Sequence, residues 1–88
     1  MWRAKRTDSG ILATVTGLLI PADWDEKGNI IAAVISTYSE EEYLIDQDAK
    51  NDELLTFLRR RVKASGLVRE DEDGNKMIAV KRYEILQV

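Results

Sequence analysis

The 88-residue chain contains no cysteine and no histidine. The lack of cysteine excludes a disulfide framework and a catalytic thiolate. The lack of histidine removes the commonest metal ligand and the usual general base near neutral pH. Nucleophilic catalysis by a serine would also need a histidine partner, which the chain does not have. We therefore expect a protein that is not an enzyme and that carries neither a metal nor another cofactor.

Long hydrophobic runs are missing as well, because no segment approaches the ~20 apolar residues that span a bilayer. The basic start of the chain, followed by Ile11–Ile20, is weakly similar to a signal peptide, but this apolar run is short and is interrupted by threonine and glycine. We expect a cytoplasmic protein with no membrane partner. With 13 basic and 16 acidic residues and a formal charge of −3, the chain lacks the basic excess of a dedicated nucleic-acid binder.

The chain contains a single proline and has an apolar fraction of 44%, which is typical of a folded domain rather than a disordered segment. Its length allows one small core and no second one. We predict that residues 1–10 form a flexible basic lead-in and that residues 11–88 form a single domain.

A β-hairpin pattern occurs twice in diverged form. It runs ATVTGLLIPADWDEKGNIIAAV from Ala13 and VKASGLVREDEDGNKMIAV from Val62. Each copy has a glycine after a small polar residue (Gly17 or Gly66), then an apolar pair, then a polar loop that ends in Gly-Asn before an apolar return strand. Glycine within a strand favours a bulge or a sharp bend, and Gly-Asn favours a turn. The repeat therefore predicts two related hairpins.

Alternating and apolar segments predict five strands in all. These strands are expected at residues 10–20, 30–38, 42–47, 62–68 and 77–87. Pro21 should end the first strand because it has no backbone donor. A bulge near Lys81 and Arg82 would bring both apolar pairs of the last strand to the core. The pairs are Ile78 with Val80 and Tyr83 with Ile85.

One helix of about three turns is expected between Asn51 and Arg61. Asn51 or Asp48 is positioned to cap its first turn. The arginines at 59–61 fall in its last turn, where the helix dipole favours cations. Apolar side chains at helical spacing give the helix one face for burial. These are Leu54, Leu55, Phe57 and Leu58.

The order strand–strand–strand–helix–strand–strand, with a glycine in the first and fourth strands, resembles the OB-fold (oligonucleotide/oligosaccharide-binding fold). The resemblance implies an all-β fold with one helix: a five-stranded antiparallel Greek-key barrel, closed at one end by the helix. The residues alone also allow a small α+β sheet with the helix packed across one face. An SH3-like barrel fits less well, since it does not usually carry such a helix.

The resemblance also implies a binding face over the second and third strands, flanked by the loops at Ala22–Asn29 and Arg69–Lys76. Aromatic side chains there would stack on bases or sugars, and cations would contact phosphates. The candidates are Trp24, Tyr38 and Tyr43 for stacking, with Lys27, Arg69 and Lys76 for phosphate. The alternative is that Trp24 folds over the barrel mouth and the tyrosines complete the core.

Charge weighs against nucleic acid at this face. The loops at 23–27 and 69–76 each carry a net charge of −2, and Glu40–Glu42 adds −3, so all three would repel phosphate. The acidic run at 70–75 lacks the spacing of an EF-hand and is expected to be a solvated turn. Positive charge lies elsewhere and defines a second candidate patch, with dipole compensation and solvated surface as the alternative for the three consecutive arginines. The patch comprises Arg59, Arg60, Arg61, Lys81 and Arg82.

These observations favour a non-enzymatic binding module. One hypothesis is weak binding of single-stranded nucleic acid. Its alternative is an acidic-surfaced protein–protein interaction or structural domain that meets a basic protein partner and binds no nucleic acid. A third is a small-molecule or carbohydrate binder that uses Trp24.

Overall fold

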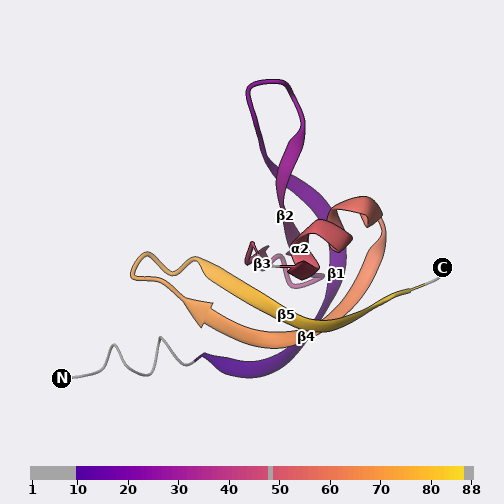
Figure 1. The fold of residues 1–88 in the computed structure, drawn as a ribbon. Coiled ribbons are helices and arrows are strands. Elements are labelled where there is room, and N and C mark those ends of the chain that lie inside the picture. Colours follow the sequence, from indigo (N-terminus) through magenta and orange to yellow (C-terminus); the bar gives the residue numbers. More distant parts are fainter. Residues whose placement is uncertain (1–9, 48, 87–88) are drawn as a thin grey trace.

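The computed structural model describes residues 10–47 and 49–86. Its elements follow the chain in the order β1 (Ile11–Trp24), β2 (Ile30–Ser36), β3 (Glu42–Ile45), α2 (Ala49–Leu54), η1 (Leu55–Phe57), β4 (Arg61–Glu70) and β5 (Lys76–Ile85). They form a small β-rich domain with one short α-helix and an adjoining 3-10 turn (Figure 1). The lead-in up to Ser9, the alternative cap Asp48 and the predicted strand end at Gln87 lie outside the described residues.

The five strands form one sheet that closes into a ring in the order β1-β2-β3-β5-β4. Neighbouring strands run antiparallel except β3 and β5, which run parallel with Tyr43 opposite Lys76. The expectation of an entirely antiparallel sheet is therefore wrong. The reason is parity: strand direction cannot alternate all the way round a ring with an odd number of strands, so one contact must be parallel.

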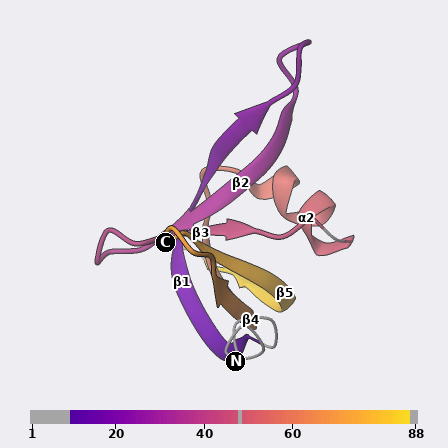
Figure 2. The same ribbon diagram turned by 90° about the vertical axis from the view of Figure 1, so that its left-hand side faces the viewer.

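Both predicted hairpins are present, as β1–β2 and β4–β5. The β1–β2 hairpin projects from the ring at the top of Figures 1 and 2, well away from the β4–β5 hairpin. Gly17 and Gly66 lie where strands pass closely: an added Cβ would be 2.3 Å from the Ser36 carbonyl oxygen and 2.0 Å from that of Ala79. The repeated glycine is therefore required by close backbone approach.

The predicted bulge in the last strand is confirmed. Ser65 of β4 pairs with Arg82, but the next residue of β4, Gly66, pairs with Val80. Lys81 is thus the extra residue on β5, and it reverses the alternation of side chains. Ile78 and Val80 before the bulge are buried, and the apolar side chains after it still pack against the core.

The turns of the two hairpins are built alike. In each, an aspartate (Asp25 or Asp71) accepts through Oδ1 the backbone N–H groups of the residues two and four places further on, all at 2.9 Å. The N–H four places on is the main cause of a lowered pKa for both carboxyls. Gly28 and Gly74 complete the turns with φ angles of 87° and 86°, which glycine adopts without steric cost.

Strand β1 continues past Pro21, contrary to the prediction. Pro21 pairs with Ala33 of β2, and the register shifts immediately after it, between Pro21 and Asp23. A proline is tolerated at such an irregularity because the ladder there does not depend on its missing donor. As a result β1 extends to Trp24.

The helix is shorter than predicted. Residues Ala49–Leu54 are α-helical and Leu55–Phe57 form a 3-10 turn, so Asn51 lies inside the helix, where it is buried, rather than at its N-cap. The backbone of Arg59 has a φ of 71°, and its N–H donates to the Leu19 carbonyl of β1 at 2.7 Å. This hydrogen bond to β1 draws the backbone out of the helical path, so the helix ends early. The arginines at 59–61 therefore do not lie in a helical turn. No helix within residues 10–47 and 49–86 is long and apolar enough to cross a membrane.

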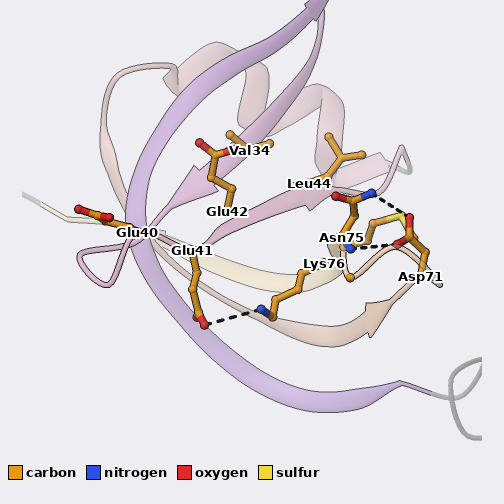
Figure 3. A pocket seen from close by; sticks show the side chains of 10 residues that line it. Val34, Glu40, Glu41, Glu42, Leu44, Asp71, Asn75 and Lys76 are labelled. Carbon is orange, nitrogen blue, oxygen red and sulfur yellow. Dashed lines mark hydrogen bonds and ion pairs between the residues drawn. The ribbon is translucent and has the colours of Figure 1, made fainter.

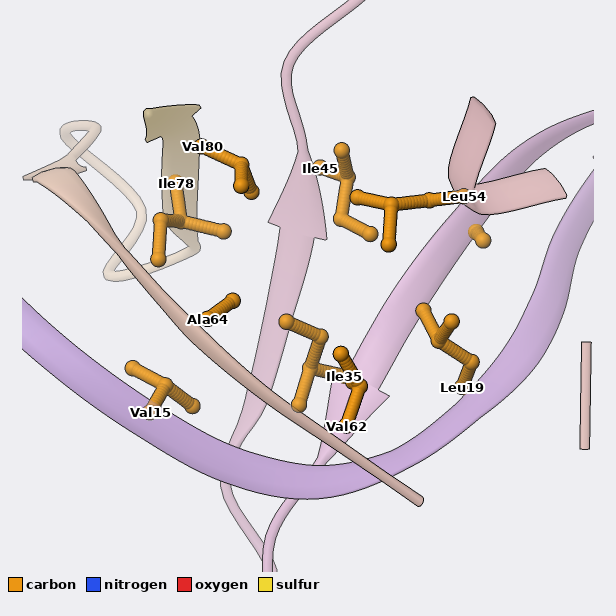
Figure 4. Packing of buried hydrophobic residues seen from close by; sticks show 10 residues of the cluster. Val15, Leu19, Ile35, Ile45, Leu54, Val62, Ala64, Ile78 and Val80 are labelled. Carbon is orange, nitrogen blue, oxygen red and sulfur yellow. The ribbon is translucent and has the colours of Figure 1, made fainter. Parts of the chain in front are cut away.

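The core fills the interior of the ring and is closed on one side by the helix. Leu54 is fully buried and reaches from α2 toward Ile45 (Figure 4). The remaining predicted apolar helix positions are partly buried against the same cluster. The prediction that this face of the helix contributes to the core is confirmed. The positions concerned are Leu55, Phe57 and Leu58.

Candidate binding cleft

A cleft of about 600 Å³ lies between the β2–β3 turn and the β4–β5 turn (Figure 3). Three neighbouring strands, β2, β3 and β5, supply its floor, and the two turns supply its rim. The residues that line it are Val34, Glu40, Glu41, Glu42, Leu44, Asp71, Gly74, Asn75, Lys76 and Met77.

The floor of the cleft is an apolar row that crosses three strands. Val34 lies opposite Leu44, and Leu44 lies opposite Met77. The next residue along each of these strands is fully or almost fully buried in the core, so alternation places the row on the outer face of the ring. Those inward residues are Ile35, Ile45 and Ile78. Leu44 at the centre of the row is 37% exposed, which leaves an apolar surface accessible to a ligand.

The rim of the cleft is acidic. Glu40 and Glu42 are exposed, and Glu40 points away from the floor at the tip of the turn (Figure 3). Glu41 lies between them, with its Oε2 3.6 Å from Nζ of Lys76. Asp71 adds a fourth carboxylate from the opposite turn. Lys76 is the single cation among the lining residues, so the cleft carries a net negative charge.

Tyr43 lies beside the cleft and not in its lining: it pairs with Ile35 and Lys76 on the inner face of the ring and packs against the core. Its hydroxyl donates to Oε1 of Glu41 at 3.0 Å, and its ring centroid lies 6.0 Å from Nζ of Lys76. Partial burial and the hydrogen bond to Glu41 both raise the pKa of Tyr43. The phenol therefore stays protonated and keeps Glu41 oriented toward Lys76.

The candidate residues from the first loop lie far from this cleft. Trp24 is 52% exposed and pairs with Ile30 at the outer end of the projecting hairpin. Lys27 lies in the turn beyond it. Tyr38 is 78% exposed and follows the opposite end of β2, about 20 Å along the strand from Ile30. Trp24 and Tyr38 therefore do not form a common stacking platform.

Tyr38 instead belongs to a second, smaller concavity on the other side of the β2–β3 turn. The guanidinium carbon of Arg61 lies 5.1 Å from the centroid of its ring, and Gly17 and Leu18 of β1 complete the lining with neighbouring residues of β2. The structure thus separates the two tyrosines: Tyr38 packs with an arginine, and Tyr43 packs against the core with its hydroxyl bonded to Glu41.

The two remaining candidates are both engaged in ion pairs. Nη2 of Arg69 lies 2.6 Å from Oδ2 of Asp46, and Lys76 contacts Glu41 as described above. Among the residues that the structure describes, these are the two ion pairs present. Both cations are about one-third exposed, and each already contacts a carboxylate, which a phosphate would have to replace.

The five basic candidates do not gather at one point. Arg59 and Arg60 precede β4, and Arg61 begins it, opposite Leu18. Arg82 pairs with Ser65, which is four residues further along β4 and therefore about 13 Å away. Lys81 is the exposed bulge residue next to it. The ladder position between Arg61 and Ser65 pairs Lys63 with Glu84, which interrupts the positive surface.

Nine of the ten residues that line the cleft were not predicted as site residues, the exception being Lys76. Those that matter most for binding are Val34, Glu41, Leu44 and Met77. The sequence does contain a signal for them. Each apolar member precedes a core residue in its strand, so alternation alone places the three on one outer face. What the sequence does not specify is the register that aligns them. Glu41 was recognised only as part of an acidic turn.

The comparisons do not assign a family to the chain. No protein-family model matches it, and no curated protein is recognisably similar. Among the described residues, no group of three or more aspartate or glutamate side chains is placed to hold a metal ion.

Proposed function

We propose that this protein is a non-enzymatic binding module with an OB-type barrel, and that its cleft binds a basic, partly apolar segment of a partner protein. The closed five-strand ring and the helix between β3 and β4 support the barrel. The position of the cleft over β2, β3 and β5, beside the β4–β5 turn, supports its use as a binding face.

The observation that carries the proposal is the combination of an apolar floor with an acidic rim. In the row from Val34 through Leu44 to Met77, Leu44 and Met77 offer accessible apolar contact, whereas Val34 is 8% exposed. The rim at Glu40–Glu42 attracts cations and repels a phosphate backbone. Charge complementarity of this kind steers association and selects partners. A peptide that alternates cationic and apolar side chains matches both parts of the cleft.

Single-stranded nucleic acid is the second candidate ligand, because Trp24 and Tyr38 are exposed aromatics and Tyr38 lies beside Arg61. Their separation leaves each to stack on its own, and a base would gain about 1–3 kcal/mol from each such contact. We therefore expect nucleic acid to bind more weakly than a basic peptide at equal ionic strength.

The proposal is tested by titrating the ¹⁵N-labelled protein with a short peptide that alternates lysine and leucine, and separately with an oligothymidylate. We expect the peptide to shift the amide signals of Leu44 and Met77 and its affinity to fall as salt is raised. The double variant Glu40→Lys/Glu42→Lys should lose the binding. The control Glu26→Lys/Glu72→Lys, which makes the same charge change at exposed turn positions outside the cleft, should retain most of it.

Shifts confined to Trp24 and Tyr38 with the oligonucleotide, and none with the peptide, would replace this proposal by the nucleic-acid one. Equal loss of peptide binding in both double variants would mean that net charge, and not the cleft, determines binding.

A further inference from the structure

Lys76 lies beside the rim of the cleft, with its side chain on the inner face of the ring, and holds a position that a cationic ligand would be expected to take. It is the first residue of β5 and lies opposite Tyr43 across the parallel β3–β5 contact. Its Nζ is 3.6 Å from Oε2 of Glu41 and 6.0 Å from the centroid of the Tyr43 ring. A carboxylate and an aromatic face are the two groups that proteins use to hold an ammonium ion.

The position of Glu41 does not depend on Lys76. Its Oε1 accepts the hydroxyl of Tyr43 at 3.0 Å. Its backbone N–H donates to Oγ1 of Thr37 at 3.2 Å, and its carbonyl accepts the N–H of Thr37 at 2.9 Å. Oε2 therefore remains available to another cation if Lys76 moves away, so a ligand would find the acceptor already oriented.

The contact that Lys76 makes is loose. A charge-assisted N–H···O bond has its optimum near 2.8 Å, and a cation–π contact weakens beyond about 6 Å, so both of its distances lie at the long end. The side chains of Lys76 and Glu41 are 32% and 46% exposed. An ammonium that arrives from solvent is not tethered to β5 and can approach Oε2 more closely than Lys76 does.

Oε2 of Glu41, the oxygen that is not bonded to Tyr43, favours an ammonium over a guanidinium as its ligand. A guanidinium is best bound by both oxygens of a carboxylate, in a bidentate arrangement. At Glu41 one oxygen is already bonded to Tyr43, which leaves a single oxygen and one ring face. That pair suits the compact point charge of a lysine side chain.

We propose that Glu41 and Tyr43 form an ammonium subsite, that the chain's own Lys76 occupies it in the free protein, and that a lysine side chain of the bound partner displaces Lys76 from it. This inference rests on the proposed function of the cleft. It assigns a lysine-bearing partner segment to the cleft. Lys76 then competes with the lysine of that segment for the subsite.

The test compares Lys76→Met with Lys27→Met, since both variants remove one positive charge and Lys27 lies in the remote β1–β2 turn. Affinity for the lysine–leucine peptide and for its arginine–leucine counterpart is measured by calorimetry, with folding checked by circular dichroism. We expect Lys76→Met to bind the lysine peptide about 3- to 10-fold more tightly than Lys27→Met does. The gain for the arginine peptide should be smaller.

A second comparison isolates the subsite. In a Glu41→Gln background the gain from Lys76→Met should vanish, because the acceptor that Lys76 blocks has lost its charge. Equal affinities of Lys76→Met and Lys27→Met for the lysine peptide would overturn the inference while leaving the cleft proposal intact. An absence of peptide binding by the wild-type protein and both variants would overturn the cleft proposal, and the inference with it.

Discussion

The guanidinium of Arg69 reaches over β5 and donates to the carboxylate of Asp46, with 2.6 Å between Nη2 and Oδ2. Arg69 belongs to β4 and pairs with Met77 of β5, while Asp46 directly follows β3 on the other side of β5. The ion pair therefore connects two strands that are not neighbours. It reinforces the parallel contact between β3 and β5 from the outside.

Removal of this ion pair should destabilise the fold slightly. Both side chains are about one-third exposed, at 37% and 28%, and solvent screening limits such pairs to about 0.5–1 kcal/mol. We expect a double-mutant cycle of Arg69→Met and Asp46→Asn, measured by urea unfolding, to give a coupling energy in that range that shrinks with added salt. A coupling near zero at low salt would show that the contact does not stabilise the ring.

The glycine at 66 should be far less replaceable than the one at 28. A Cβ at Gly66 would lie 2.0 Å from a backbone oxygen, whereas at Gly28 nothing lies within 4 Å and the cost comes only from its φ of +87°. We expect Gly66→Ala to cost more than about 3 kcal/mol and Gly28→Ala about 1 kcal/mol of unfolding free energy. Denaturant titrations followed by circular dichroism would decide between this order and its reverse.

Acid should weaken both hairpin turns. The pKa values of Asp25 and Asp71 are lowered in the folded protein, so their stabilising effect is complete above the unfolded-state value of about 3.9. It is lost as the pH falls through the folded-state values. We expect the melting temperature of wild type to exceed that of Asp25→Asn/Asp71→Asn by a few degrees at pH 7. This difference should narrow below pH ~4; a difference that stays constant down to pH ~2 would contradict the assignment.

Leu54 should be the helix residue on which the fold depends most. It is fully buried against the core, whereas Leu18 on the outer face of β1 is 42% exposed. We expect Leu54→Ala to cost about 2–5 kcal/mol through lost apolar contact and a residual cavity. Leu18→Ala serves as the matched control and should cost about 1 kcal/mol or less. Similar losses for the two variants would mean that the helix does not close the core as described.

The repeated hairpin could be predicted because its determinants are local. The glycines at 17 and 66, the Gly-Asn ends of the two loops and the bulge near Lys81 are all encoded within a few residues of where they act. The role of Asp25 and Asp71 was missed, although an aspartate precedes the Gly-Asn pair by three residues in both copies. Aspartate in this position commonly bonds to the backbone of its own turn.

Features that depend on distant parts of the chain could not be predicted in the same way. The helix ends near the point where the backbone of Arg59 bonds to Leu19, which lies some forty residues earlier in the chain. No local sequence pattern indicates this contact. The cleft depends on the register of β3 against β5. A parallel contact could have been predicted from the expected five-stranded barrel, because a closed ring with an odd number of strands must contain one.

The single parallel contact also affects how the protein should unfold locally. β3 has four residues, against ten in each of β4 and β5, so its contacts with β2 and with β5 are the two shortest in the ring. Of these two the β3–β5 contact should separate more easily, because parallel pairing is slightly less stable per residue. Opening there would part Leu44 from Met77 and Tyr43 from Lys76 at once, which dismantles the cleft floor and the lysine contact together. The amide protons of this junction should therefore exchange with solvent before those of the β4–β5 ladder. A bound partner segment that spans β3 and β5 would slow that exchange, because it would hold the two strands of the ring together.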